Sequence, residues 1–362
     1  MKPFINGSLD SDCKLYHMEN HPQNFPLRKE LLVSVIISTY NRCAALPLTL
    51  QALGEQTIPS SQYEVLVVDD GSTDDTSQVL EQVAFSCSLR TFRQPENRGV
   101  SAGRNVAIHQ ARGRYLIFLS DDMIVPENFI ATHVATLEQF PGYWIVGGIQ
   151  QIDSTTETPF GRYLDRQERV FEEARKAKPI GYNLWEMSWP TARNLSLPRA
   201  DLERTGLFDE QFRISCEDQD LAHRAMDVGV RFLYNANITC LHNDQVATLE
   251  RACRQQQQFA HDGALFCAKR PHIHGDAELV RLNGYLSWHD KPRLIAKKLI
   301  KQLIATRLAT ALIESTVHLA ERARVPEPLL YRMYRLVIGL YIFRGWRHGL
   351  QTLKRREADL NA

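Results

Sequence analysis

Two pairs of neighbouring acids follow apolar segments of this chain, and their spacing suits chemistry at one edge of a fold. The first pair is Asp121-Asp122 in the run LSDDM, and the second is Glu217-Asp218 in the run ISCEDQDLAHRAMDVG. Adjacent carboxylates offer the oxygen ligands that a hard divalent cation prefers. A single carboxylate can instead take a proton as a general base. We therefore expect a metal site at the first pair and a catalytic base at the second.

Polar residues also follow two apolar runs nearer the N-terminus. They are Thr39, Tyr40, Asn41 and Arg42 in VSVIISTYNR, and Asp69 and Asp70 in VLVVDDGSTDDT. A carboxylate at the end of the second run can accept the N3–H of a uracil ring. The same DDGS sequence is also typical of an Asx-type turn that caps the following helix. Residue types alone leave both interpretations open.

Apolar runs alternate with helical patterns through the first third of the chain. This order predicts a mainly parallel, doubly wound α/β sheet, in which ligands bind beyond the carboxyl ends of the strands. A further strand is expected at 145–152, and the aperiodic segment 153–190 is expected to form substrate loops. The strands expected first are 31–38, 63–68, 89–93 and 115–119, with helices at 44–56, 73–84 and 100–111.

Composition bounds the class of protein. With 362 residues, 44% of them hydrophobic, the chain is long enough for one large domain plus an appendage. A formal net charge of +1 excludes a general nucleic-acid binder. The seven cysteines are odd in number and scattered, which favours reduced thiols over a disulfide framework or a zinc site. The N-terminus shows no signal-peptide pattern and no apolar run is long enough to span a bilayer, so a cytoplasmic location is expected.

The C-terminal part differs in charge from the rest. Residues 281–356 carry 16 Lys and Arg against 4 Asp and Glu, a formal balance of +12. Apolar residues recur near helical spacing over 294–319 and 329–347, with basic residues between them. Basic amphipathic helices can lie on the anionic inner face of a membrane as a peripheral association. They can equally pack on a catalytic domain or form a homodimer, and the sequence leaves the three alternatives open.

Six motifs taken together resemble the inverting family 2 glycosyltransferases of the GT-A fold. The resemblance runs from about residue 33 to residue 243, and the motifs occur in the order VSVIISTYNR, VVDDGSTD, ENRGVSAGRN, FLSDD, GLFDE and EDQDLAHR. It implies a doubly wound, mainly parallel GT-A sheet with a nucleotide-sugar site at the strand carboxyl ends and a helical C-terminal extension. It also implies transfer of a sugar, with a UDP-sugar favoured as donor, to a hydroxyl of a glycan or lipid-linked acceptor in polysaccharide, glycolipid or other glycoconjugate synthesis.

The resemblance assigns the metal and the base to particular residues. Asp122 is the expected direct ligand of Mg²⁺ or Mn²⁺, with Asp121 as a sugar or outer contact. His242 resembles a late histidine that completes the metal or phosphate site. Asp218 is the expected base, with Glu217 beside it. The family's further Asp, two residues before the first acid of the pair, is Leu119 here, so the site is a shortened variant.

The resemblance also implies donor and acceptor contacts. Asp70 is the expected base contact with Asp69 close behind, and Thr39, Tyr40, Asn41 and Arg42 are expected around the base and ribose. Arginines after a glycine turn at a helix start suit a diphosphate, and Arg104 is ranked above Arg98. On the acceptor side the matching residues are Trp189 and Asn194. These assignments have purely structural alternatives. The arginines can be solvated, the tryptophan can belong to the core, His242 can be a hydrogen-bonded residue at a strand end, and Ser215 and Asp218 can form a helix cap.

These interpretations give a domain plan and leave rivals. The competing classes are a non-catalytic sugar-nucleotide-binding partner of a glycan assembly complex, a receiver-like signalling domain and a nucleotidyltransferase. The segments expected are a flexible N-terminal arm at 1–30, a GT-A domain at 31–245 with a nucleotide-binding half at 31–125 and an acceptor half at 126–245, and a helical basic region at 246–362.

Overall fold

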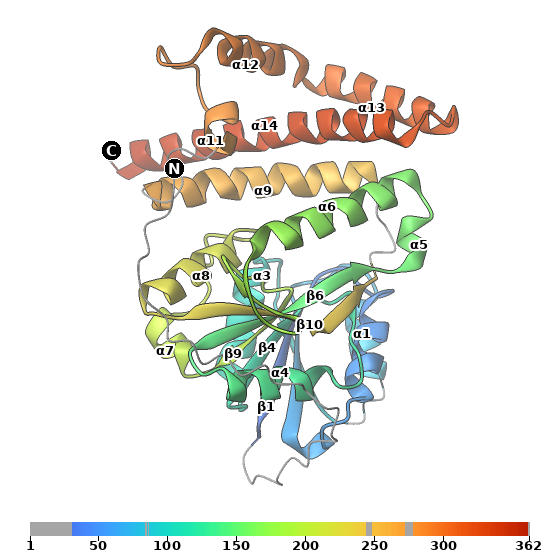
Figure 1. The fold of residues 1–362 in the computed structure, drawn as a ribbon, viewed down its shortest axis with the longest axis vertical. Coiled ribbons are helices and arrows are strands. Elements are labelled where there is room, and N and C mark those ends of the chain that lie inside the picture. Colours follow the sequence, from blue (N-terminus) through green and yellow to red (C-terminus); the bar gives the residue numbers. More distant parts are fainter. Residues whose placement is uncertain (1–30, 84, 86, 244–247, 272–277, 361–362) are drawn as a thin grey trace.

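A computed structural model describes residues 31–83, 85, 87–243, 248–271 and 278–360. The predicted N-terminal arm at 1–30 lies outside these residues. One mixed sheet of ten strands forms the centre of residues 33–242, and a layer of long helices lies against one end of it (Figure 1).

The first half of the sheet has the predicted parallel arrangement. Strands β1 to β4 pair in the order β3-β2-β1-β4, all parallel, and all but β3 are almost wholly buried. Continuous apolar runs suit this position because helices cover both faces of the sheet. The elements are β1 (Val33–Thr39), α1 (Leu46–Gly54), η1 (Ser60–Gln62), β2 (Tyr63–Asp69), α2 (Thr76–Gln82), β3 (Ser88–Arg93), α3 (Val100–Gln110) and β4 (Tyr115–Leu119).

The second half of the sheet is mixed. Strand β9 is antiparallel to both β4 and β6, and β10 is parallel to β6 but antiparallel to β5 and β8. The hairpin of β7 and β8 forms the far edge. The elements are β5 (Met123–Ile124), α4 (Phe129–Gln139), β6 (Tyr143–Gln151), α5 (Asp153–Thr156), β7 (Lys176–Gly181), β8 (Leu184–Met187), β9 (Asn194–Pro198), α7 (Asp201–Thr205), α8 (Glu217–Asp227) and β10 (Arg231–His242).

The prediction of substrate loops over 153–190 is wrong. This segment contains the 17-residue helix α6 (Pro159–Arg175) and the β7–β8 hairpin. Helix α6 is rich in charged residues, and its buried aromatic residues Phe160 and Tyr163 lie at its start. The helix is amphipathic, so its sequence carried a helical pattern that the prediction missed. Its apolar face needs a partner surface from elsewhere in the chain.

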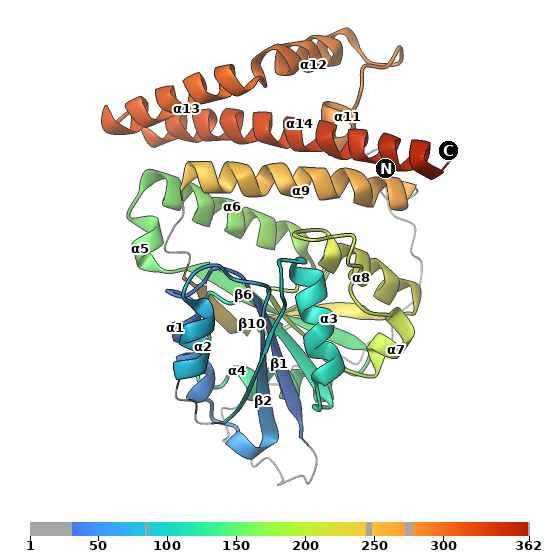
Figure 2. The same cartoon turned by 180° about the vertical axis from the view of Figure 1, so that it is seen from behind.

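That partner surface is the helical C-terminal layer. Phe160 and Tyr163 pack with residues of α9, α13 and α14, including Leu249, Val317 and Tyr334, in one apolar cluster. Figures 1 and 2 show α6, α9 and α14 stacked in succession above the sheet, with α12 and α13 outermost. The helices are α9 (Leu249–Lys269), α11 (Glu278–Asn283), α12 (Pro292–Ile304), α13 (Arg307–Arg322) and α14 (Glu327–Leu360).

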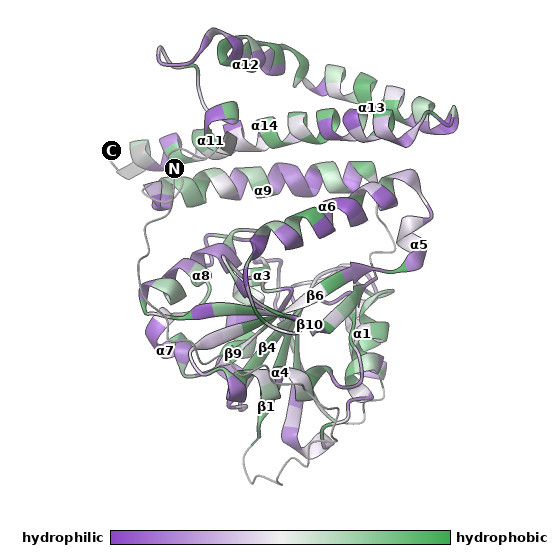
Figure 3. Cartoon of the chain, viewed as in Figure 1, coloured by the Kyte–Doolittle hydropathy of each residue, from purple (hydrophilic) through white to green (hydrophobic). Residues whose placement is uncertain are grey.

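The outer helices keep apolar side chains exposed. Leu303, Leu308 and Leu312 are 74%, 82% and 70% exposed. Hydropathy alternates along α12 and α13 in Figure 3, with apolar and polar turns side by side. None of the described helices is long and apolar enough to cross a membrane. Of the three alternatives for the basic tail, packing within the protein therefore describes α14. Helices α12 and α13 present leucines outward, so association with a membrane or a second copy stays open for them.

Candidate active site

The predicted acids do meet at one edge of the sheet. Asp121-Asp122 directly follow β4, and β4 pairs with β9 so that Leu119 lies opposite Asn194. The backbone N–H of Ser120 donates to the carbonyl of Arg193 at 3.1 Å, and the N–H of Ala192 donates to the Asp218 carboxylate at 3.3 Å. The loop before β9 thus links the first acidic pair to the second.

The Asp121-Asp122 pair is buried and partly neutralised by two cationic or polar neighbours. Arg42 lies 3.4 Å from Asp121 Oδ1 and 3.3 Å from Asp122 Oδ2. His242 Nε2 is 3.3 Å from the same Asp122 oxygen, and its Nδ1 faces Gln151 Nε2 at 3.0 Å. The prediction placed Arg42 against the base or ribose; the structure places it on the acids instead.

The two carboxyls are driven apart in acidity. Burial and the charge of Asp122 raise the pKa of Asp121 to about 6. Burial acts upward on Asp122 as well, but His242 and the charges of Arg42 and Arg193 outweigh it and lower the pKa of Asp122 to about 2. Asp122 therefore stays ionised to a lower pH than Asp121, which suits a metal ligand.

The residues around Asp122 fit a divalent cation only as a partial ligand set. Asp122 Oδ1 is buried without a hydrogen-bond partner among the described residues, which is costly unless a ligand satisfies it. Within the described ranges, however, no group of three or more His, Cys, Asp or Glu side chains is arranged to hold a metal. Mg²⁺ usually takes one or two carboxylates plus substrate phosphates and water. Asp122 and His242 suit that incomplete set.

Asp69 and Asp70 are both occupied by the protein itself. Asp70 accepts hydrogen bonds from the backbone N–H groups of Arg98 and Gly99 at 2.8 and 2.7 Å, and from Gln94 Nε2 at 2.6 Å. Asp69 accepts from the N–H of Ser72 at 2.8 Å. Both side chains are buried. This arrangement argues against Asp70 as the base contact, and it supports the structural alternative of a carboxylate that orders its own loop.

The helix start expected to hold a diphosphate is filled by Asp70. Gly99 precedes α3 with φ 98°, a conformation that glycine adopts readily. A Cβ there would lie 2.5 Å from the carbonyl oxygen of Arg213, so the position also requires glycine for space. Anions are stabilised at helix N-termini, and here the anion is the Asp70 carboxylate. The prediction of a diphosphate at this turn is therefore not supported.

The two candidate phosphate arginines have protein partners. Arg104 is buried in α3, donates to Glu217 Oε1 at 2.7 Å and to the carbonyl of Ala192 at 3.3 Å. Arg98 pairs with Glu210 at 2.8 Å on the surface. Arg104 thus braces the start of α8 rather than facing open space.

The residues after β1 surround an exposed tyrosine. Asn41 has φ 54° and accepts hydrogen bonds from the N–H groups of Thr73 and Asp74, so it ties this loop to the loop after β2. Thr39 is buried and its Oγ1 lacks a hydrogen-bond partner within the described chain. Tyr40 is 42% exposed. Tyr40 therefore has the accessible ring face that a nucleotide base needs.

Helix α8 holds Asp218 at its first turn next to a strained residue. Cys216, just before the helix, has φ 66° in the left-handed region, which costs a non-glycine residue roughly 1–3 kcal/mol. Ser215 bonds to Asp262 instead of capping the helix, so the predicted cap of Ser215 and Asp218 does not form. Asp218 accepts from the N–H groups of Gln219 and Ala192 and is only partly buried. Its position fits a base better than a cap.

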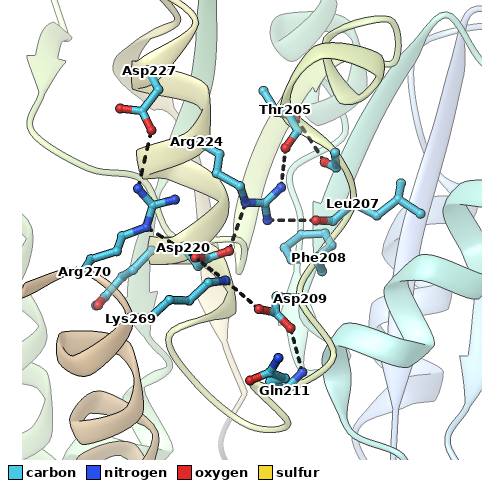
Figure 4. Close-up of polar contacts among 12 residues, drawn as sticks. Thr205, Leu207, Phe208, Asp209, Gln211, Asp220, Arg224, Asp227, Lys269 and Arg270 are labelled. Carbon is cyan, nitrogen blue, oxygen red and sulfur yellow. Dashed lines mark hydrogen bonds and ion pairs between the residues drawn. The ribbon is translucent and has the colours of Figure 1, made fainter.

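Asp220 anchors the same helix. It is fully buried, and its carboxylate meets Arg224 at 2.9 Å, Lys269 at 3.0 Å and Arg270 at 3.5 Å, as Figure 4 shows. Lys269 and Arg270 come from the end of α9, so this network fixes α8 against the helical layer. A buried carboxylate with several cationic partners fixes its helix in place, because moving the helix away would leave a buried charge without partners.

The acceptor-side predictions divide. Asn194 is fully buried, its Nδ2 donates to the carbonyls of Gly148 and Ile238, and its Oδ1 faces His133. It is a structural residue, and its assignment to the acceptor is wrong. Trp189 is partly exposed on the loop before β9, which suits a sugar platform. Trp185 packs against the core beside Tyr234.

Sequence reasoning missed two arginines near the second acidic pair. Arg193 donates to Glu168 of α6 at 2.6 Å, and the charges of Asp122 and Asp218 both act on it. Arg175 ends α6 and is buried near Arg193, Glu168 and Asp218. Arg193 adjoins the motif residue Asn194 and was within reach of the sequence. Arg175 lies in the segment mistaken for loops.

Comparison with known proteins agrees with this geometry. Residues 34–190 match the family described as glycosyl transferase family 2. The match includes four of the six motifs on which the resemblance rests, from VSVIISTYNR to FLSDD. It is 26% identical over 293 residues to the uncharacterized glycosyltransferase YfnE of Bacillus subtilis, covering 69% of this chain and 74% of YfnE. It is 38% identical over 117 residues to glycosyltransferase AglE of Haloferax volcanii, covering 32% of this chain and only 38% of AglE.

The match to a solved structure extends from the sheet into the helical region. The structure matches the mannosyltransferase PcManGT from Pyrobaculum calidifontis, solved in complex with GDP-Man and Mn²⁺, with a TM-score of 0.57, 19% identity and coverage of 92% of this chain and 91% of that one. At that identity the likeness shows the fold. The predicted α/β fold class with C-terminal helices is confirmed.

Proposed function

We propose that this family 2 protein is an inverting, metal-dependent glycosyltransferase that moves a sugar from a nucleotide-diphosphate sugar to a hydroxyl acceptor. The observation that carries the proposal is the pairing of two sites at one sheet edge. Asp122 keeps an unsatisfied buried oxygen beside His242, and Asp218 is partly exposed at the start of α8. The charges of both carboxylates act on Arg193, which lies near both sites. We also propose residues 31–245 as the catalytic domain, with halves dividing near residue 125.

The donor side requires charge neutralisation. When bound, Mg²⁺ or Mn²⁺ would stabilise the negative charge on the departing nucleoside diphosphate. Asp122 and His242 would hold it. Binding through His242 Nε2 requires the ring proton on Nδ1 and the Gln151 amide turned so that its oxygen, which has no other partner among the described residues, accepts that proton. Arg42 supplies a fixed positive charge at the same carboxylates. Tyr40 offers an exposed ring for the base.

The acceptor side requires a base. Inversion by single displacement needs one carboxylate to take the hydroxyl proton as that oxygen attacks the anomeric carbon. We assign this proton transfer to Asp218. Glu217 is buried and turned toward Arg104 at 2.7 Å, so it positions the helix start. We propose Trp189 as an acceptor platform.

The identity of the donor's nucleotide follows from fewer contacts than the metal site or the base. A UDP-sugar follows from the resemblance and from an acidic partner for a uracil N3–H. Since Asp69 and Asp70 are already hydrogen-bonded within the protein, that argument loses most of its force. The structurally similar PcManGT was solved with GDP-Man. The donor panel must therefore contain both UDP- and GDP-sugars. The acceptor proposed is a glycan or a lipid-linked sugar.

A donor screen tests the function. The full chain is incubated with Mn²⁺ and each nucleotide sugar, and release of the nucleoside diphosphate is read with water and with a panel of sugar alcohols and glycans as acceptors. Turnover of one donor, loss of turnover in excess chelator, and a product of inverted anomeric configuration by NMR support the proposal. A binder of nucleotide sugars that turns over none of them would instead be a non-catalytic partner. Release of a sugar 1-phosphate, with transfer of the nucleoside monophosphate to the acceptor, would indicate a nucleotidyltransferase.

We propose an anionic membrane surface as the partner of the outer helices. The exposed leucines of α12 and α13 lie among exposed basic residues, including Arg293, Lys297 and Arg307. This arrangement matches an interfacial helix, whose apolar face enters the headgroup region while cations meet anionic lipids. A homodimer through the same leucines is the outcome that would replace this proposal.

A further inference from the structure

A buried arginine at the end of α6 keeps two guanidinium nitrogens without a hydrogen bond among the described residues. Arg175 is 2% exposed. Among the residues that the structure describes, neither its Nε nor its Nη1 has a hydrogen-bond partner. Its guanidinium packs over the Phe171 ring at 4.6 Å. A buried charge is costly unless it is paired and hydrogen-bonded, so this site calls for an anion.

The surroundings of Arg175 place that anion next to the proposed base. Glu168 lies seven residues earlier, two turns back on the same face of α6. Glu168 holds Arg193 at 2.6 Å, so both arginines gather along this face. The charges of Arg193, Glu168 and Asp218 all act on Arg175.

The backbone closes the same neighbourhood. The N–H of Ser188 donates to the carbonyl of Arg175 at 3.0 Å, and the N–H of Ala192 donates to Asp218. The loop 188–193 therefore runs from Arg175 to the base and carries Trp189 between them. Burial and the charge of Arg193 lower the pKa of Arg175, and the charges of Glu168, Glu172 and Asp218 only partly oppose this.

We propose that Arg175 and Arg193 bind a phosphate group of the acceptor, beside Asp218. Two guanidinium groups suit a phosphate because each can donate a forked pair of hydrogen bonds to its oxygens. The proposal deepens the proposed function, on which it rests, and names the acceptor as a phosphate-bearing alcohol or sugar. Because Arg175 is enclosed, the ligand enters only after side chains of the loop 188–193 rearrange.

The acceptor is favoured over the donor diphosphate by position. The donor's diphosphate is assigned to Asp122 after β4, His242 at the end of β10 and Arg42 after β1. Arg175 follows α6 at the other acidic pair, where the attacking hydroxyl is deprotonated. Arg193 lies between the two pairs, which brings the acceptor phosphate near the reacting centre without merging the two sites.

Inorganic phosphate tests the site in the full chain. Its binding is measured by calorimetry with and without saturating UDP and Mg²⁺, for wild type, Arg175→Met and the control Arg169→Met. Arg169 is an exposed arginine of the same helix. We expect wild type to bind phosphate with UDP present, Arg175→Met to bind roughly tenfold or more weakly, and Arg169→Met to match wild type, since a charge-assisted hydrogen bond is lost only in the first.

The melting temperature without phosphate separates a ligand site from a structural one. Arg175→Met removes two buried nitrogens that have no hydrogen bond and keeps an apolar side chain of similar length, so the variant should be at least as stable as wild type. A clear fall in its melting temperature, unchanged phosphate affinity in that variant, or absent phosphate binding in wild type would overturn the proposal. Displacement of phosphate by UDP would assign Arg175 to the donor site and also overturn it. A separate titration of UDP in the absence of phosphate tests donor binding alone. Failure of UDP to bind there would count against the proposed function and not against the phosphate site.

Discussion

Replacement of Asp218 by asparagine tests the proposed base with the smallest structural change. The carboxylate accepts hydrogen bonds from the N–H of Gln219 at 2.8 Å and from the N–H of Ala192 at 3.3 Å. Asparagine keeps one acceptor oxygen and replaces the other by an NH₂ group. The short bond to Gln219 can therefore persist while the long bond to Ala192 is lost.

The expected effects on stability and on turnover differ in size. Loss of one hydrogen bond typically costs about 1 kcal/mol of unfolding free energy, which lowers the melting temperature by only a few degrees. Loss of a general base costs on the order of 10²-fold or more in kcat, or about 2.7 kcal/mol of barrier. The donor contacts do not include Asp218, so the donor dissociation constant should stay within about twofold.

The assay compares three proteins with the donor identified by the screen. Nucleoside diphosphate release gives kcat, calorimetry gives donor affinity, and thermal unfolding gives stability, for wild type, Asp218→Asn and the control Asp227→Asn. Asp227 ends the same helix and is exposed, 3.4 Å from Arg270. A kcat for Asp218→Asn within tenfold of wild type, with Asp227→Asn unchanged, would refute the assignment of the base.

Three further outcomes are expected. Asp122→Asn, or excess chelator on wild type, should lower turnover on the order of 10²-fold or more, as expected when a group that stabilises developing charge is removed; full activity in chelator contradicts the metal site. Burial lowers the pKa of His133 to about 3. Below pH 6.5 the unfolded chain therefore binds a proton at this residue that the native state does not bind, and the free energy of unfolding decreases as the pH is lowered. Urea unfolding of wild type should lose about 2 kcal/mol more between pH 7 and pH 5 than His133→Gln does; equal losses contradict this. Leu303→Glu with Leu308→Glu should reduce co-sedimentation with anionic liposomes severalfold, while the exposed α1 residue change Leu48→Glu should not; equal binding to neutral vesicles, or a dimer that the variant splits, contradicts the membrane proposal.

The sequence by itself determined the strands that carry the site. The run before Thr39 and the run before Asp69 are continuous and apolar, and such runs are buried wherever helices cover both faces of a sheet. Because parallel strands end at one edge, the acids after β4 were predicted to be near those after β2. The start of α8 at Glu217 was also predicted, since acids in a first turn precede its apolar face.

Tertiary structure alone decided what each polar side chain contacts. Asp70 meets backbone N–H groups 28 and 29 residues later, and Arg104 meets Glu217 113 residues later. Such contacts leave no local pattern, since a buried ion pair and a ligand contact use the same residue types. The surroundings of Arg175 could not be predicted for the same reason. The amphipathic pattern of α6 was present in the sequence, but only the folded C-terminal layer shows which surface its apolar face packs against.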